Sequence, residues 1–327
     1  MLQSEKVRFA ASPILLIESS GSKAVEDACK HVQFILSQQL GLRTVISNSL
    51  KESAFPTLEL VEQQQELASR VGAGTVCAVG SEAAIHLGKA IVQDDMDELI
   101  LFPTSYAAVM ASTLQRSLLI DTKEETLVPS KTGVLNQERQ HADVTLALPD
   151  QPKLNAGEDH ATTEAAFAVL GFCLVRELQN LSYNNEILAD LEQFVSHVEE
   201  DRQEDAAKAL QAAVLLIGED ISWGFGRERR DIPLALAASL LPKIFPSSNS
   251  MSMMAALVSN LTQDEKTQLE HLKARLVKAL GEPLTLVSNQ SVDTLMGVVR
   301  ENQASWNCLD PRKEFLTKCL SSYSLVD

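Results

Sequence analysis

One stretch of the chain combines a buried strand, a tight turn and a helix. Within residues 71–91, VGAGTVCAVGSEAAIHLGKAI, the apolar, β-prone run Thr75–Val79 predicts a strand. Gly80–Ser81 predicts a turn, and Glu82–Ile91 has the composition of a helix with Lys89 near its end. Such a strand, turn and helix form half of a nucleotide-binding α/β unit, because the helix N-terminus directs backbone N–H groups at phosphate.

The segments around this stretch repeat the alternation of strand and helix over roughly the first 150 residues. The expected strands are Pro13–Glu18, Arg43–Ser47, Thr75–Val79, Leu99–Phe102, Ser117–Asp121 and Val144–Leu148. The expected helices between them include Val25–Leu40, Pro56–Arg70 and Glu82–Ile91. This alternation predicts a mostly parallel, Rossmann-like sheet with right-handed crossovers.

From about Pro152 onward, strand patterns are nearly absent and apolar residues recur at helical spacing. The expected helices are Asp159–Leu178, Asn185–Val198, Arg202–Ile217, Ile232–Phe245, Ser250–Asn260, Gln263–Leu280, Asp293–Gln303 and Pro311–Ser322. The sequence therefore predicts two domains. Residues 1–151 form an α/β, nucleotide-binding-like domain, and residues 152–327 form an all-helical domain.

The net charge and the cysteine content limit which binding partners and which cellular compartment are expected. The net charge of −16 makes nucleic acid and anionic membrane surfaces poor partners, which leaves a small-molecule substrate or a nucleotide. Five scattered cysteines without a CxxC motif indicate reduced thiols, and the longest apolar runs are too short to span a bilayer. We therefore expect a cytoplasmic protein. An organelle signal stays open because Lys6 and Arg8 precede a short apolar run, and a homodimer stays open as well.

Five segments follow one another in an order that is informative. They are PTLELVEQQQELASRVGAGTVCAVG (56–80), FPTSYAA (102–108), ADVTLALPD (142–150), QEDAAKALQAAVLLIGEDIS (203–222) and LDPR (309–312). Together they resemble motifs of the iron-containing alcohol dehydrogenase and dehydroquinate synthase superfamily, with maleylacetate reductases and glycerol dehydrogenases among its members. The resemblance implies an NAD(P)-dependent oxidoreductase of a small aldehyde, ketone or keto acid, in which a divalent metal polarises the carbonyl group.

The resemblance also assigns cofactor-binding residues. The glycine-rich phosphate loop of the superfamily corresponds here to Gly80, Ser81, Glu82 and Ala83. Glu82 would add a negative charge beside a phosphate, which opposes binding. Thr104 and Ser105 are the hydroxyl donors in the turn that supplies a second contact. Glu18, at the end of the first expected strand, is a candidate acceptor for ribose hydroxyls and would favour NAD over NADP.

The metal ligands of the superfamily correspond to Asp159, Thr163, Asp220 and Leu234. Two carboxylates, Asp159 and Asp220, are therefore the candidate ligands, whereas leucine has no ligand atom. His160 and Glu164 are spaced i, i+4 and provide an alternative pair. On paper the ligand count of a transition-metal site is not met.

Three functions remain open at this point. The first is a metal-assisted, NAD(P)-dependent oxidoreductase. The second is a catalytically inactive homologue that retains the two-domain shell for nucleotide or protein binding. The third is a metal-independent reductase with His86 or His160 as the proton donor.

Overall fold

The computed structural model describes the chain in fourteen segments. They are residues 13–19, 23–50, 55–92, 98–114, 117–123, 126–129, 144–145, 160–179, 183–221, 232–245, 248–261, 269–282, 286–301 and 313–324. The chain divides by its internal contacts into two compact units, Met1–Pro149 and Asp150–Asp327. Each unit is described by itself.

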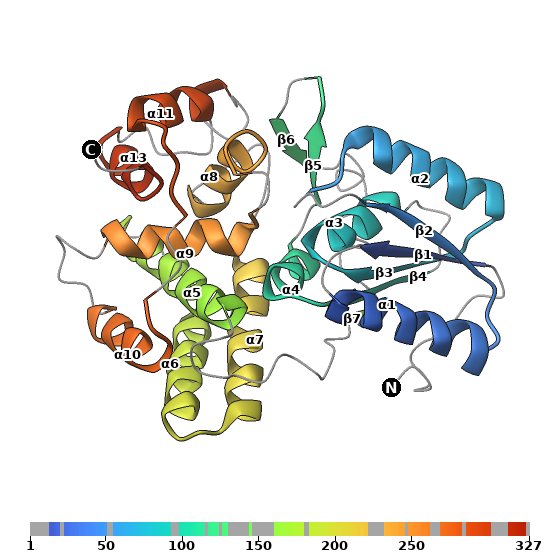
Figure 1. Cartoon of the computed structure of the whole chain (residues 1–327), viewed down its shortest axis with the longest axis horizontal. Coiled ribbons are helices and arrows are strands. Elements are labelled where there is room, and N and C mark those ends of the chain that lie inside the picture. The colour runs from blue at the N-terminus through green and yellow to red at the C-terminus, as the bar shows by residue number, and fades with distance from the viewer. Residues whose placement is uncertain are drawn as a thin grey trace. The chain divides into compact units, whose positions relative to one another are not determined.

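The first unit contains a parallel sheet of five strands in the order β2-β1-β3-β4-β7 (Figure 1). The strands are β1 Ile14–Ser19, β2 Thr44–Leu50, β3 Thr75–Gly80, β4 Glu98–Pro103 and β7 Val144–Thr145. The chain passes from β1 to β2 on one side and then returns to β3 on the other side, so the strand order reverses between β1 and β3. The predicted fold class, a parallel α/β region followed by helices, is confirmed.

Helices cover both faces of this sheet. They are α1 Lys23–Phe34, continued by the π-helical turn Ile35–Gln39, α2 Leu58–Val71, α3 Glu82–Ile91 and α4 Tyr106–Thr113. One core cluster joins α1 to strand residues such as Leu16 and Val79. The other core cluster joins α2, α3 and α4 to strand residues such as Leu15 and Ala78. Figure 1 shows α1 and α2 on opposite sides of the sheet.

The central strand β3 is buried along its whole length, which explains its unbroken apolar sequence. Helix α3 packs against it unusually closely at Gly88. A Cβ atom added at Gly88 would lie 2.5 Å from the Cβ atom of Ala78. Glycine is therefore required at this position for the helix to approach the sheet.

Ser117–Asp121, expected as a strand, contains β5 (Leu118–Asp121). It lies outside the parallel sheet and pairs in antiparallel orientation with β6 (Thr126–Pro129). The backbone N–H of Ile120 donates to the carbonyl of Pro56 at 2.8 Å, which attaches this ribbon to the segment before α2. Only a few residues separate β5 from β6, too few for the crossover that parallel pairing needs.

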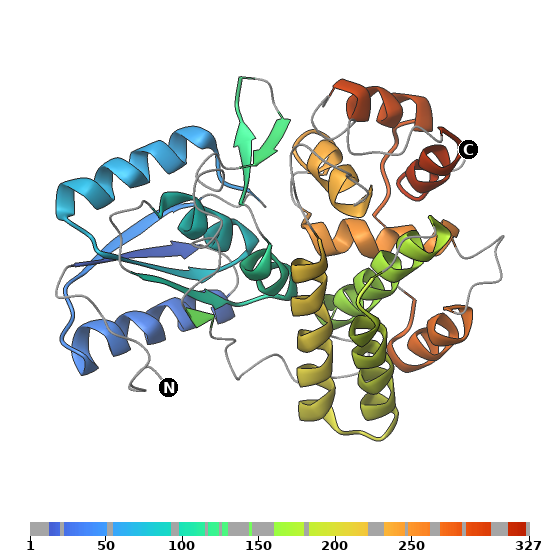
Figure 2. The same cartoon turned by 180° about the vertical axis from the view of Figure 1, so that it is seen from behind.

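The second unit is built from helices. They are α5 His160–Leu178, α6 Asn185–Glu199, α7 Gln203–Asp220, α8 Ile232–Leu240, α9 Ser250–Leu261, α10 Glu270–Leu280, α11 Val292–Glu301 and α13 Lys313–Ser321. A short turn connects α6 to α7, and the two helices lie side by side (Figure 2). Across the described part of the whole chain, none of the helices has both the length and the apolar character that crossing a bilayer requires.

Helix α5 forms the centre of this unit, and twelve of its residues are buried. It crosses α9 at Gly171, where an added Cβ atom would come closer than 3.0 Å to the carbonyl oxygen of Met254. The C-terminal segment is attached to α9, because the hydroxyl of Tyr323 donates to the carbonyl of Met253 at 2.6 Å.

Candidate functional site

The candidate nucleotide site lies at the carboxyl edge of the parallel sheet. In the register of the sheet, Glu18 of β1 is opposite Val79, and Gly80 of β3 is opposite Pro103 of β4. The turns after β3 and β4 are joined directly, because the N–H of Thr104 donates to the carbonyl of Gly80 at 3.0 Å. In open α/β sheets, ligands bind outside the carboxyl ends of strands where the strand order reverses, and here that point falls between β1 and β3.

Helices α3 and α4 begin at this edge. Gly80 has a φ of 131°, a conformation that favours glycine, and Ser81 takes the N-cap position of α3. Ser105 is the N-cap of α4, and its Oγ accepts the N–H of Ala108 at 3.2 Å. The two helix N-termini each present partial positive charge, the polarity that favours a bound anion. The hydroxyl oxygen of Ser105 is therefore already an acceptor within its own helix.

Two polar atoms at this edge have no hydrogen-bond partner among the described residues. They are Oε1 of Glu18 and Oγ1 of Thr104, and both are shielded from solvent. Burial raises the pKa of Glu18. A shielded polar atom without a partner costs free energy unless a ligand or water satisfies it. These two atoms are therefore available to a ligand or water at this edge.

Glu82 and His86 occupy the interior of the first unit. Glu82, the first residue of α3, is 2% exposed, and His86 has no exposed surface. Nδ1 of His86 accepts the N–H of Leu118 at 3.2 Å, so the imidazole proton belongs on Nε2, which lies 3.7 Å from Oε1 of Glu82. Burial lowers the pKa of His86. A role as proton donor would require substrate to reach this enclosed ring.

Two of the predicted metal-ligand positions, Thr163 and Asp220, are described in the second unit, and each has its own surroundings. Asp220, at the end of α7, lies 3.7 Å from the guanidinium of Arg176. Thr163 lies on α5 thirteen residues before Arg176, so their Cα atoms are about 20 Å apart along the helix. An arginine side chain extended toward Thr163 does not span that distance. This geometry does not support the assignment of Asp220 and Thr163 to one metal ion, which stays a prediction.

The other assigned positions add nothing to such a centre. Asp159 and the side chain of Leu234 lie outside the described residues. His160 is exposed at the first turn of α5, and Oε2 of Glu164 accepts a hydrogen bond from Asn249 at 3.4 Å. Among the residues that the structure describes, no group of three or more His, Cys, Asp or Glu side chains is arranged to hold a metal ion. The residues that the structure describes therefore do not supply a ligand set that fits the metal implied by the resemblance.

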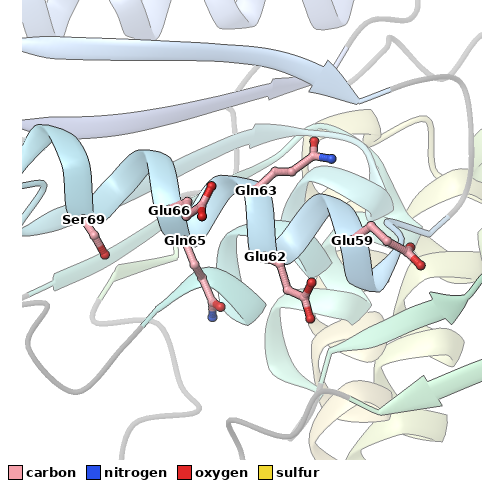
Figure 3. A pocket seen from close by; sticks show the side chains of 6 residues that line it. All are labelled: Glu59, Glu62, Gln63, Gln65, Glu66 and Ser69. Atoms are coloured by element: carbon pink, nitrogen blue, oxygen red, sulfur yellow. The ribbon is translucent and has the colours of Figure 1, made fainter.

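An open hollow of about 580 Å³ lies along α2. Its described lining consists of Glu59, Glu62, Gln63, Gln65, Glu66 and Ser69, all on that helix (Figure 3). Glu59 accepts a hydrogen bond from the hydroxyl of Thr122, which lowers the pKa of Glu59. The three carboxylates make this hollow unfavourable for a nucleotide phosphate.

The residue that the sequence analysis missed is Lys89. It is 9% exposed although a lysine near a helix end is ordinarily solvated. The one signal available in the sequence was its position in a helix whose other residues are mostly apolar.

A parallel sheet covered on both faces and followed by an all-helical unit defines a class of two-part folds, with an α/β part and a helical part. The particular fold is that of the iron-containing alcohol dehydrogenases and maleylacetate reductases, because solved structures of both are similar to this chain. The resemblance inferred from the sequence is therefore confirmed at the level of the fold. No family model matches the sequence, and no curated protein matches it significantly.

Three solved structures illustrate this likeness. An iron-containing alcohol dehydrogenase from Thermotoga maritima has a TM-score of 0.64 at 13% identity, over 95% of this chain and 90% of that chain. A maleylacetate reductase from a Rhizobium strain has a TM-score of 0.61 at 17% identity, over 94% and 88%. A sulfoacetaldehyde reductase from Bifidobacterium kashiwanohense, in complex with NAD+, has a TM-score of 0.62 at 13% identity, over 97% and 92%.

Proposed function

We propose that the chain binds NAD(H) or NADP(H) at the carboxyl edge of its parallel sheet and is an oxidoreductase of a small aldehyde, ketone or keto acid. In this proposal residues 1–151 bind the nucleotide, and residues 152–327 provide the substrate side. The observation that carries it is the pair of shielded, unsatisfied atoms, Oε1 of Glu18 and Oγ1 of Thr104, beside the start of two helices. One similar structure holds NAD+.

The residues at this edge have separate roles in the proposal. The N–H groups at the start of α3 and α4, together with the hydroxyl of Thr104, bind the diphosphate. The absence of a side chain at Gly80 lets the backbone approach the phosphate. The carboxylate of Glu18 accepts the ribose hydroxyls and repels a 2′-phosphate, so NAD(H) is preferred over NADP(H). The bound nicotinamide would supply or accept the hydride.

Titration with NADH and NADPH, followed by nicotinamide fluorescence, tests the binding. Thr104→Val keeps the shape of the side chain and removes its hydroxyl. Since a hydrogen bond to a charged group contributes about 1.5–3 kcal/mol, the dissociation constant should rise about tenfold or more. Thr113→Val is the matched control, because Thr113 lies at the other end of α4, where its hydroxyl donates to the carbonyl of Met110.

Several outcomes would decide the matter. Failure of both nucleotides to bind at millimolar concentration removes the proposal. Equal weakening by the two valine variants shows that the site is elsewhere. Glu18→Gln should shift the preference toward NADPH, because it removes the carboxylate that repels a 2′-phosphate; an unchanged NADH-to-NADPH ratio removes Glu18 from the site.

A second candidate is an inactive homologue that binds a nucleotide or a protein without a redox step. The placement of Asp220 beside Arg176, away from Thr163, favours it. Single-turnover assays with NADH and a panel of aldehydes, ketones and keto acids, after dialysis against Fe²⁺, Zn²⁺ or Mn²⁺, separate the candidates. Nucleotide binding without oxidation of NADH under every condition supports the second.

A further inference from the structure

Lys89 has an environment that is rare for a lysine. Every residue of α3 is buried, and Lys89 in its last turn is 9% exposed. Its ammonium group donates to the carbonyls of Ala111 at 2.9 Å, Ser112 at 3.4 Å and Leu114. An ammonium group has three N–H donors, so these three carbonyls satisfy it fully.

The three carbonyls belong to the end of α4 and the residue that follows it. A helix leaves its last C=O groups without intrahelical partners, and its C-terminus carries partial negative charge. Helix α4 has only eight residues, YAAVMAST, and none of them is charged. A helix of this length is marginal by itself. Lys89 therefore supplies, from a neighbouring helix, the cationic C-cap that α4 lacks in its own sequence.

The protonated form of Lys89 is the form that this arrangement selects. Burial lowers the pKa of Lys89 to about 7. A neutral amine has two N–H donors and one lone pair, which would face the third carbonyl oxygen and repel it. The contact with the helix C-terminus opposes the loss of the proton.

Lys89 does not reach the candidate nucleotide site itself. It lies seven residues after Glu82, the first residue of α3, which is about 10 Å along the helix axis. At the other end of the helix pair, the N–H of Thr104 donates to the carbonyl of Gly80. Helices α3 and α4 are thus joined at both ends: by a backbone hydrogen bond at the carboxyl edge and by the ammonium group of Lys89 at the far end.

We propose that Lys89 is a positioning residue for nucleotide binding: its ammonium group fixes α4 against α3, so that the N-terminus of α4 and Thr104 stay aligned with the N-terminus of α3. This inference rests on the proposed function. The alternative is that Lys89 contributes to overall stability alone, like any well-packed core residue. The two differ in whether α4 loosens selectively and whether a small cation restores it.

Two variants and one control test the proposal. Lys89→Met keeps an unbranched side chain and removes the charge, and Lys89→Ala opens a cavity lined by the three carbonyls. Ile91→Ala is the control, because Ile91 is fully buried on the same helix and has no polar group to offer α4. For each protein we would measure the dissociation constant for NADH, the melting temperature and hydrogen exchange across α4.

Both Lys89 variants should bind NADH about tenfold more weakly than the control and lose exchange protection in residues 106–114 before the rest of the first unit. n-Butylammonium should restore binding to Lys89→Ala at millimolar concentration, and 1-butanol, which has the same length without the charge, should not. Rescue by both compounds, or equal loss in Ile91→Ala, overturns the positioning role.

The failures of the two proposals are distinguishable. If the unaltered protein binds NADH and the Lys89 variants bind it equally well, the positioning role is wrong and the proposed function stands. If the unaltered protein binds neither nucleotide, both proposals fall. In that case the exchange data still show whether Lys89 holds α4.

Discussion

Gly171 on α5 faces the backbone of α9 at a distance that leaves no room for a methyl group. A Cβ atom there would come closer than 3.0 Å to the carbonyl oxygen of Met254 and within 3.3 Å of Cγ2 of Val258. The first neighbour is a backbone atom inside a helix, so it cannot rotate away as a side chain can. In Gly171→Ala, α5 and α9 must separate.

The magnitude follows from two opposing terms. Overpacking of a core by one methyl group costs about 1–3 kcal/mol, and a clash with backbone belongs at the upper end. Alanine is favoured over glycine inside a helix by about 1 kcal/mol. The net loss for Gly171→Ala is therefore about 2 kcal/mol, or a decrease in melting temperature of about 4–8 °C for a unit of this size.

The assay is thermal and urea unfolding followed by circular dichroism at 222 nm. Gly297→Ala provides the matched control, because a Cβ atom at Gly297, in the middle of α11, meets nothing within 4 Å. The control should gain about 0.5–1 kcal/mol. If Gly171→Ala is as stable as the unaltered protein, or gains stability as the control does, the close crossing of α5 and α9 is wrong.

Three further perturbations have definite expected results. Because burial lowers the pKa of His86, the unfolded chain binds the proton more tightly than the folded chain does, and the free energy of unfolding should fall by up to about 1.5 kcal/mol from pH 6.5 to pH 5. His86→Asn retains an acceptor for the same backbone donor and should reduce this pH dependence, as measured by urea unfolding at each pH. His31→Asn, at an exposed site, is the control and should leave the pH dependence unchanged. Tyr323→Phe removes the hydroxyl that donates to the carbonyl of Met253, a carbonyl that also lies within helix α9, and should lower the free energy of unfolding by about 0.5–1.5 kcal/mol; an unchanged urea midpoint contradicts that hydrogen bond. Asp220→Asn should leave bound Fe, Zn or Mn unchanged in elemental analysis, and a drop in bound metal would restore it as a ligand.

The sequence was sufficient for the alternation of strands and helices in the first half and for the helices of the second half, but it predicted neither α4 nor β6. Strand β3 was expected at Thr75–Val79 and spans Thr75–Gly80, because an apolar run bounded by glycines leaves few alternatives. Glu18 was placed at the end of a strand by the same pattern, whereas Thr104 and Ser105 were assigned through the family resemblance; in the structure β1 ends next to β3, and Thr104 follows β4. Their binding role stays a proposal.

The contacts between elements could not be predicted from the sequence. Lys89 looks like an ordinary solvated lysine at a helix end, because nothing local says that α4 will end against it. The spacing of Thr163 and Asp220 along the chain likewise does not say which end of α5 the last turn of α7 meets, and the observed partner is Arg176. Both features depend on tertiary packing, which the residue pattern of a single sequence does not show.

The contact between Gly88 and Ala78 restricts how this protein can change over time. The two positions share a space that holds one methyl group, so their substitutions are coupled: alanine at 88 becomes acceptable only if 78 becomes glycine. The double variant Ala78→Gly/Gly88→Ala should therefore be more stable than the sum of the two single changes implies. Among descendants of this chain, residues 78 and 88 are therefore expected to change together or to stay as they are.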